Sequence, residues 1–394
     1  MQKKKTVIAF IVNRIVPTGP LFVVQDIISF LPRDQYCVHI VELRPSAPEA
    51  EDMRTLLIGR GCYLHSLGCS FGALELRTRM VSRKLEGLLR KINANIVHSH
   101  TYHPDLVTAY LVNSFNVITT QHNLSLEDFV RSKGFIMGNY MHHRLLLALT
   151  KHKHLVGITH FVKDYYRTRL PQSKKFDVVY NGISPFRFFP VTEEQRKDLR
   201  TRLSLRQDTF IMVVAGTLSL RKDPITILKA IYQLRDEGSL PERFLLLFLG
   251  DGPLSAHCMR YAKGLKGKVQ FAGFVPQPEL YMQAANASIS ASLSEGFGLN
   301  VAEAVFCGLP TITTTIGPLL ELSNSISALR ELRFAPKDVD GCAQAILKSI
   351  KTTLGKEEQK QFMQQLSAQR MSQEYKLLYQ DLVAQKTKQK NNCI

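Results

Sequence analysis

Short apolar segments recur along this chain, and stretches of helix length separate them. Many of the segments are rich in β-branched residues, which favours strands. Strands are predicted in the first half at Thr6–Val12, Cys37–Leu43, Ile96–His100, Val117–His122, His154–Thr159 and Asp177–Tyr180, and in the second half at Phe210–Gly216, Phe244–Gly250, Val269–Phe271, Ala287–Ala291 and Pro310–Thr314. Alternating strands and helices predict parallel sheets with helices on both faces. The two series therefore predict an α/β protein with two doubly wound, Rossmann-like domains.

Turn-forming residues mark the predicted boundary between these domains. Asn181-Gly182 is a turn dipeptide, and Pro185 and Pro190 interrupt any regular element. Apolar residues spaced by three or four predict a helix over Lys356–Val383. We expect an N-terminal domain at 1–185, completed by a C-terminal helix at 366–385, and a second domain at 190–365.

Composition excludes several classes of protein. Hydrophobic residues make up 45 % and charged residues 21 %, which is unlike a disordered chain or a coiled coil. No apolar run approaches the roughly 20 residues that a membrane-spanning helix needs. Lysines precede the first apolar run as in a signal peptide, but no small-residue cleavage site follows, so we interpret that run as a buried strand. The seven cysteines are odd in number and include no CxxC pair, which argues against a disulfide framework or a zinc site and indicates the cytosol.

The formal net charge of +18 adds a preference for phosphate-bearing partners. Such a partner could be an anionic membrane surface, a lipid diphosphate, a nucleotide or a nucleic acid. No nucleic-acid recognition motif and no basic stripe with interleaved aromatic residues is present, so we expect no nucleic acid.

Residues 287–310 contain the strongest chemical signal. The predicted strand runs into a loop with Gly296 and Gly298, and a helix is predicted to begin near Leu299. Such glycines let the backbone approach a ligand, and the first amides of the helix suit a diphosphate. Glu295 lies before the loop, and Glu303 is expected in the first turn of the helix. We interpret the two carboxylates as partners for hydroxyl groups on either side of a diphosphate; the alternative for each is a solvated carboxylate at a helix start.

The segment Ser294-Glu-Gly-Phe-Gly-Leu-Asn-Val-Ala-Glu-Ala304, followed by Cys307-Gly-Leu-Pro310, resembles the signature of the retaining GT-B glycosyltransferases of family 4. The resemblance extends over nearly the whole chain, through Asn95-Ile-Val-His-Ser-His100, Thr119-Thr-Gln-His122, Val178-Val-Tyr-Asn-Gly182, Leu249-Gly-Asp-Gly-Pro253 and Val269-Gln-Phe-Ala-Gly273. It implies two domains that face each other across a cleft.

The same resemblance assigns site residues. It implies catalytic roles for Glu295, His122 and Lys222, with Glu295 near the donor sugar and Lys222 on the leaving diphosphate. It implies donor binding by Gly19, Arg221, Val275, Phe297, Gly298, Leu299, Asn300 and Glu303. The alternatives are a surface lysine for Lys222 and a histidine satisfied in the core for His122.

Two positions depart from the family pattern. The family usually has an arginine where this chain has Thr217; Arg221 is a substitute, although on a regular backbone its side chain would point elsewhere than that of Lys222. The family commonly has two adjacent glycines after the first strand, where this chain has Pro17-Thr18-Gly19-Pro20. Gly19 can make the turn, but Pro20 lacks a backbone donor.

We expect no metal and no cofactor beyond a nucleotide-sugar co-substrate, with a UDP-sugar favoured over a GDP-sugar. His98, His100 and His103 cluster in sequence without acidic or cysteine ligands, which indicates packing and acceptor-side polarity. Asp338-Val339-Asp340 resembles a metal-binding DxD string, but its position before a helix predicts a helix cap.

Basic residues concentrate in the N-terminal domain, and apolar residues lie between some of them. The basic residues are Arg77, Arg79, Arg83, Lys84, Arg90, Lys91, Arg131, Lys133, Arg144, Lys151 and Lys153, and the apolar ones Phe135, Ile136, Met137, Tyr140 and Met141. This combination suits an anionic membrane surface and a lipid-linked acceptor. The alternative is a solvated basic face.

The resulting hypothesis is a retaining hexosyltransferase on the cytoplasmic face of the inner membrane. It would transfer a hexose or N-acetylhexosamine from a nucleotide sugar to a glycan or lipid-linked saccharide in lipopolysaccharide, O-antigen or capsule synthesis. The alternatives are a sugar-nucleotide epimerase with the GT-B fold and a catalytically inactive sugar-binding homologue.

Overall fold

The computed structural model describes residues 5–46, 50–172 and 174–391, which form two compact units. The chain passes from the first unit to the second after Gly182 and returns to the first at Ala368. The sequence had placed the domain boundary at 185–190 and the start of the returning helix at 366. We refer to the two parts as the N-terminal unit and the C-terminal unit.

The N-terminal unit contains a seven-stranded parallel sheet in the order β3-β2-β1-β4-β5-β6-β7. The strands are β1 (Thr6–Val12), β2 (Tyr36–Glu42), β3 (Tyr63–Ser66), β4 (Ile96–His100), β5 (Asn116–Gln121), β6 (His154–Gly157) and β7 (Lys175–Val178). The helices are α1 (Gly19–Ser29), α2 (Glu51–Gly59), α3 (Phe71–Leu76), α4 (Thr78–Lys91), α5 (Tyr102–Thr108), α6 (Ser125–Lys133), α7 (Phe135–Leu149), α8 (His160–Arg167) and α18 (Ala368–Asn391).

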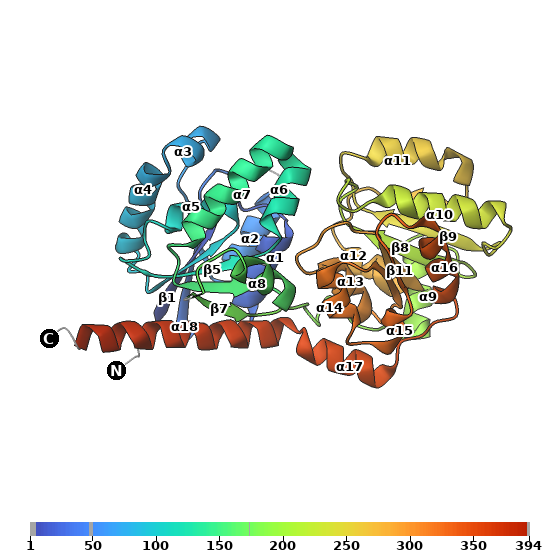
Figure 1. Cartoon of the computed structure of the whole chain (residues 1–394). Helices are drawn as coiled ribbons and strands as arrows, with labels where there is room; N and C mark the ends of the chain where they lie inside the picture. The colour runs from blue at the N-terminus through green and yellow to red at the C-terminus, as the bar shows by residue number, and fades with distance from the viewer. Residues whose placement is uncertain (1–4, 47–49, 173, 392–394) are drawn as a thin grey trace. The chain divides into compact units, whose positions relative to one another are not determined.

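Side chains from β1 alternate between two separate cores. Phe10 packs in a core that includes Tyr375 and Tyr379 of α18, whereas Ile11 packs in a second core with Leu85 of α4. Successive side chains of a strand point to opposite faces of the sheet, so helices must cover both faces of a strand that is apolar throughout. The C-terminal helix α18 thus completes the N-terminal unit, and it is the long red helix of Figure 1.

The C-terminal unit contains a six-stranded parallel sheet in the order β10-β9-β8-β11-β12-β13. The strands are β8 (Phe210–Ala215), β9 (Phe244–Leu249), β10 (Val269–Phe271), β11 (Ala287–Ser290), β12 (Thr311–Thr314) and β13 (Arg333–Phe334). The helices are α9 (Glu193–Arg202), α10 (Pro224–Asp236), α11 (Ser255–Tyr261), α12 (Pro278–Ala284), α13 (Leu299–Phe306), α14 (Gly317–Ser323), α15 (Ser327–Arg330), α16 (Val339–Ser349) and α17 (Lys356–Gln365), with the 3₁₀ turn η2 (Ala262–Leu265).

The prediction of two parallel α/β sheets is confirmed, and each predicted strand lies within two residues of its expected ends. The pattern missed the edge strands β3 and β13, because β3 buries no residue and β13 has only two residues. The continuous helix predicted over Lys356–Val383 is wrong. It breaks between α17 and α18, where the Leu366 carbonyl accepts a hydrogen bond from the Ile183 amide (2.8 Å).

Within the described residues, no helix is both long enough and apolar enough to cross a membrane. Asp338 accepts a hydrogen bond from the Gly341 amide (2.9 Å) at the start of α16, so the first aspartate of the DxD string caps a helix as predicted.

Candidate active site

Two neighbouring strands of the C-terminal sheet, β8 and β11, lead into the loops that carry Lys222 and Glu295. Lys222 Nζ lies 2.6 Å from Glu295 Oε1, and Arg221 Nη1 lies 2.9 Å from Oε2 of the same carboxylate. The Ser292 hydroxyl donates a third hydrogen bond to Oε1 (2.8 Å). One carboxylate is therefore held by two cations and a hydroxyl group.

Glu295 carries its charge across the whole neutral range. Burial by itself raises the pKa of this carboxyl group, since its side chain is only 9 % exposed. The charges of Lys222 and Arg221, with the hydrogen bonds, outweigh burial and bring the pKa down to about 2. The site is thus an ionised carboxylate enclosed by a net positive charge.

Arg221 and Lys222 converge on Glu295 although they are adjacent in sequence. The expectation that Arg221 points elsewhere is wrong, because the backbone here is not regular. The Lys222 amide donates to the Ser219 carbonyl (3.1 Å), which closes a turn. Arg221 Nη1 also donates to the Ser294 carbonyl (2.9 Å), so its side chain lies along the loop that carries Glu295.

Asn300 connects the start of α13 to β8 and to Lys222. Its Nδ2 donates to the Ala215 carbonyl (3.1 Å), and its Oδ1 accepts from Lys222 Nζ (3.4 Å). Gly298 precedes α13 with φ +100°, and a Cβ there would lie 2.4 Å from the Leu319 side chain, so only glycine fits. Among the described residues no side chain caps α13, which leaves its first backbone amides for an anionic ligand.

The remaining residues that were expected to bind the donor lie in three segments of the C-terminal unit: the Glu295 loop, α13 and the loop between β10 and α12. Phe297 is buried in the loop, and Leu299 is half-buried as the first residue of α13. Glu303 is the fifth residue of α13, one turn further than expected, so a role as a helix-start carboxylate is wrong. Val275 is half-buried on a different loop, between β10 and α12.

Sequence reasoning missed Ser292 and the Ala215 carbonyl as partners of the site. The signal available for Ser292 was its position three residues before Glu295 in a serine-rich run. No signal pointed to Ala215, because a backbone carbonyl leaves no trace in the sequence.

The N-terminal unit contains a cavity of about 840 Å³ at the carboxyl edge of its own sheet. We call it the N-unit cavity. Its apolar and aromatic lining comes mainly from α3, α5, α6 and α7. The lining residues are Asn13, Pro20, Arg44, Phe71, Gly72, Glu75, Leu76, Thr101, Tyr102, His103, Thr120, Gln121, His122, Asn123, Asp128, Phe129, Lys133, Met137, Tyr140, Met141 and Leu145.

His122 lines this cavity and is held by a chain of histidines. His122 Nε2 and His100 Nδ1 share a hydrogen bond (2.8 Å), and the His100 ring lies against that of His98, with 4.1 Å between centroids. His98 in turn bonds the Tyr379 hydroxyl of α18 and the Thr120 hydroxyl, each at 2.8 Å. Burial lowers the pKa of His122 to about 3, so its ring is neutral at physiological pH.

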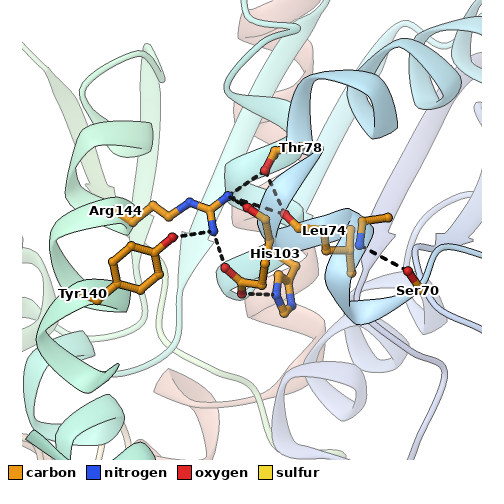
Figure 2. Close-up of polar contacts among 8 residues, drawn as sticks. Ser70, Leu74, Thr78, His103, Tyr140 and Arg144 are labelled. Carbon is orange, nitrogen blue, oxygen red and sulfur yellow. Dashed lines mark hydrogen bonds and ion pairs between the residues drawn. The ribbon is translucent and has the colours of Figure 1, made fainter. Parts of the chain in front are cut away.

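Glu75 and His103 line the cavity and form a polar cluster with Arg144. Figure 2 shows the hydrogen bonds and ion pairs around Arg144 and His103. Arg144 pairs with the Glu75 carboxylate and also donates to the Glu75 carbonyl (2.6 Å) and the Thr78 hydroxyl (2.7 Å). His103 Nε2 lies 2.8 Å from Glu75 Oε1. Tyr140 closes the cluster, with its hydroxyl 3.3 Å from Arg144 Nη1. The cluster joins α7 to α3 and α4.

Two sequence expectations fail at this cluster. Arg144 was counted with the basic face, but its side chain is only 20 % exposed and is committed to Glu75. His103 was expected to have no acidic neighbour, yet Glu75 supplies one from 28 residues earlier in the chain. The described residues contain no group of three or more His, Cys, Asp or Glu side chains arranged to hold a metal.

The loop after β1 is compact. Gly19 is the first residue of α1, and Pro20 is the second and lies on the cavity wall. The first amides of a helix have no partner within the helix, so the missing donor of Pro20 removes no helical hydrogen bond. Gly19 and Pro20 belong to the N-terminal unit, and the loop that carries Glu295 belongs to the C-terminal unit.

Basic and apolar side chains are exposed together on two segments beside the cavity. Leu76 and Met80 are 84 % and 54 % exposed and alternate with the exposed Arg77, Arg79 and Arg83. We call the first segment, residues 76–84, the α4 edge. Phe135, Ile136 and Met137, at the start of α7, are likewise 75 %, 85 % and 51 % exposed and follow the exposed Arg131 and Lys133. We call residues 131–137 the α7 tip.

Comparison with known proteins gives two family matches. Residues 195–368 match the model for glycosyl transferases group 1, and residues 19–187 match the model for glycosyltransferase family 4. The chain is 23 % identical over 297 residues to the O-antigen biosynthesis glycosyltransferase WclY of Escherichia coli, which covers 73 % of this chain and 79 % of the relative. It is 22 % identical over 303 residues to an Escherichia coli UDP-Gal:alpha-D-GlcNAc-diphosphoundecaprenol alpha-1,3-galactosyltransferase, which covers 73 % and 74 % of the two chains. The structure of Anabaena HepE in complex with UDP and glucose superposes with a TM-score of 0.76 at 15 % identity, over 95 % of this chain and 100 % of that one.

Proposed function

The chain belongs to the glycosyltransferases of group 1 and family 4, with the GT-B fold, and from this membership we propose its reaction. We propose that it transfers a hexose or N-acetylhexosamine from a UDP-sugar, with retention, to a glycan or lipid-linked saccharide. The product would be lipopolysaccharide, O-antigen or capsule. The observation that carries the proposal is the ionised Glu295 held between Lys222 and Arg221 beside the uncapped start of α13.

The charges of this site suit a nucleoside diphosphate. Lys222 and the first amides of α13 would bind the phosphate next to the sugar, because a lysine and a helix start both attract oxyanions. Asn300 Oδ1, which lies 3.4 Å from Lys222 Nζ, keeps the ammonium group beside those amides. Glu303, one turn along α13, would accept hydrogen bonds from the ribose hydroxyls. A relative named for UDP-galactose and a neighbour solved with UDP support uridine as the base.

The transfer step follows from the same charges. The bond between the anomeric carbon and the diphosphate oxygen breaks, and the acceptor oxygen bonds to that carbon from the same face. The acceptor proton passes to the departing phosphate oxygen. Lys222 and the amides stabilise the negative charge that develops on the diphosphate, and the ionised Glu295 stabilises the positive charge at the anomeric carbon. His122, neutral because its pKa is about 3, would hold the sugar by hydrogen bonding.

Features of the N-terminal unit support acceptor binding and docking to a membrane. The N-unit cavity has the size of a small-molecule site, and its largely apolar surface also includes polar and charged side chains. The α4 edge and the α7 tip expose basic and apolar side chains together, which suits docking to an anionic leaflet. We therefore place the enzyme on the cytoplasmic face of the inner membrane.

The experiment is donor hydrolysis without acceptor. The purified chain is incubated with UDP-glucose, UDP-galactose, UDP-N-acetylglucosamine and GDP-mannose, in EDTA, and the released sugar is followed by proton NMR. We expect one UDP-sugar to be hydrolysed and the α anomer to appear before mutarotation, since water replaces the acceptor on the same face. Lys222→Gln should abolish release, whereas the exposed Lys263→Gln on the same unit should not.

Initial release of the β anomer would overturn retention while leaving the transferase assignment intact. Loss of activity in EDTA with recovery in magnesium or manganese would overturn metal independence. Failure of every sugar nucleotide to react, or to raise the melting temperature, would overturn the proposed function.

A further inference from the structure

Arg44 lies on the wall of the N-unit cavity, immediately after β2, and is half-buried. Its guanidinium carbon is 5.6 Å from the centre of the Phe71 ring. The Arg44 amide donates to the Asn13 carbonyl (3.0 Å), which places the ends of β1 and β2 side by side. Burial, and then the positive charge of the neighbouring Arg14, lower the pKa of Arg44. Arg14 thus adds positive charge near Arg44, and Arg44 is the one of the two that lines the cavity.

The carboxylates near these arginines are engaged elsewhere. Glu42 binds Arg54 (3.1 Å) and the Ser46 hydroxyl. Glu75 binds Arg144 and His103. Among residues 5–46, 50–172 and 174–391, no carboxylate lies within ion-pair distance of Arg14 or Arg44.

Two further polar atoms, one each in Asn13 and Arg14, lack hydrogen-bond partners among the described residues. Arg14 Nε is buried and has no acceptor among the described residues, and the side-chain oxygen of Asn13, which also lines the cavity, is buried without a donor. Burying an unpaired charge or an unpaired polar atom is unfavourable, and such groups are normally satisfied. Arg44 on the cavity wall is therefore a cation without a carboxylate partner among the described residues, and an anion bound in the cavity would supply one.

We propose that the N-unit cavity binds an acceptor that carries a phosphate or diphosphate ester, with Arg44 as its ligand. This inference rests on the proposed transfer to an acceptor and specifies the chemistry of that acceptor. The planar guanidinium of Arg44 binds two phosphate oxygens, and the field of Arg14 adds attraction because the anion relieves their mutual repulsion. Phe71, Tyr140 and the other apolar lining residues contact the groups attached to the phosphate.

Two kinds of molecule have this chemistry: a saccharide joined to a lipid by a diphosphate, and a soluble sugar phosphate. The test uses the full-length chain saturated with UDP, so that the proposed donor site is already filled. Titration with UDP alone comes first, and it tests the donor site independently of the acceptor. Inorganic diphosphate, a hexose 1-phosphate and phosphatidylcholine vesicles carrying a polyprenyl diphosphate are then titrated in turn by calorimetry or flotation.

We expect the UDP-loaded chain to bind inorganic diphosphate and at least one of the two esters. Arg44→Gln should weaken this binding at least about tenfold, the scale of a lost charge-assisted hydrogen bond. Arg44→Lys should weaken binding less, because lysine keeps the positive charge but cannot donate to two phosphate oxygens as the planar guanidinium does. The matched control is Arg33→Gln, which removes an exposed charge before β2, at the opposite edge of the same sheet, and should bind as the parent does.

The melting temperature distinguishes an arginine that binds the acceptor from one that stabilises the fold. Because Arg44 repels Arg14 and has no acidic partner, Arg44→Gln should melt at the parental temperature or above. Binding of the vesicles alone assigns the lipid diphosphate, and binding of the hexose 1-phosphate alone assigns the soluble ester. Unchanged binding in Arg44→Gln, an equal loss in Arg33→Gln, or a lowered melting temperature of Arg44→Gln would each overturn the inference.

Discussion

The ammonium group of Lys222 lies 2.6 Å from the Glu295 carboxylate, so the cation expected on the donor diphosphate is paired with an acid of its own chain. Arg221 holds the other oxygen of that carboxylate at 2.9 Å. We therefore expect an incoming diphosphate to compete with Glu295 for the same two cations, and donor affinity to depend on the balance between them.

The first prediction concerns that competition. Glu295→Gln removes the negative charge but keeps the shape, so Lys222 and Arg221 become fully available to phosphate. We expect UDP to bind at least as tightly as in the parent, while donor hydrolysis falls by about 10²-fold or more through loss of electrostatic stabilisation. Calorimetry and turnover measure the two effects, with the exposed Glu242→Gln as control. Weaker UDP binding in Glu295→Gln would contradict the competition.

The second prediction tests whether Glu303 binds the ribose or the phosphates of UDP. If Glu303 accepts hydrogen bonds from the ribose, Glu303→Ala should weaken UDP binding by about 1–3 kcal/mol. Inorganic diphosphate, which has no ribose, should bind equally to Glu303→Ala and to the parent. An equal loss for both ligands would place Glu303 on the phosphates instead.

The third prediction concerns pH. Burial lowers the pKa of His122 to about 3, so His122 does not change charge between pH 5.5 and 8. His122→Gln, which keeps a hydrogen-bonding group, should lower the rate by a similar factor at every pH in this range. The pH–rate profiles of the two proteins should therefore be parallel. A parental profile with a histidine ionisation near pH 6.5 that the variant lacks would show that His122 acts as an acid or a base.

The fourth prediction concerns the Glu75–Arg144 pair. Arg144→Met leaves Glu75 half-buried without its cation and breaks the hydrogen bonds from α7 to the Glu75 carbonyl and Thr78. We expect a loss of about 3 kcal/mol in the free energy of unfolding, measured in urea. The exposed pair between Arg90 and Glu86 provides the control, since Arg90→Met should lower the free energy of unfolding by less than about 1 kcal/mol. Similar losses for the two variants would mean that the cluster does not hold α7 in place.

The fifth prediction concerns the membrane. Replacing Arg79, Arg83 and Lys84 of the α4 edge with glutamine should weaken binding to anionic vesicles at low salt. The difference from the parent should shrink as the Debye length falls to about 8 Å at physiological ionic strength. Ile136→Ser at the α7 tip should weaken binding at all salt concentrations, because it removes apolar contact rather than charge. Equal binding of the parent to neutral and anionic vesicles would refute electrostatic docking.

The two sheets and the loop that begins at Glu295 could be predicted from the amino-acid sequence. Both depend on local patterns. Runs of β-branched residues form strands wherever they lie, and Gly298 at φ +100° is required by its own backbone and by contact with Leu319. The sequence pattern did not predict β3, which buries no side chain, or β13, which has only two residues.

The contacts between side chains could not be predicted in this way, because they depend on the folded chain. Arg221 reaches the Ser294 carbonyl over 73 positions of sequence, and His98 meets Tyr379 over 281, so no spacing rule could pair them. In the sequence Arg144 resembles a surface cation, yet in the folded chain it pairs with Glu75, whereas Arg44 has no acidic partner among the described residues. The physical reason is that an ionised group takes its partner and its solvation from whatever the fold brings within a few ångströms. Its residue type fixes only the charge.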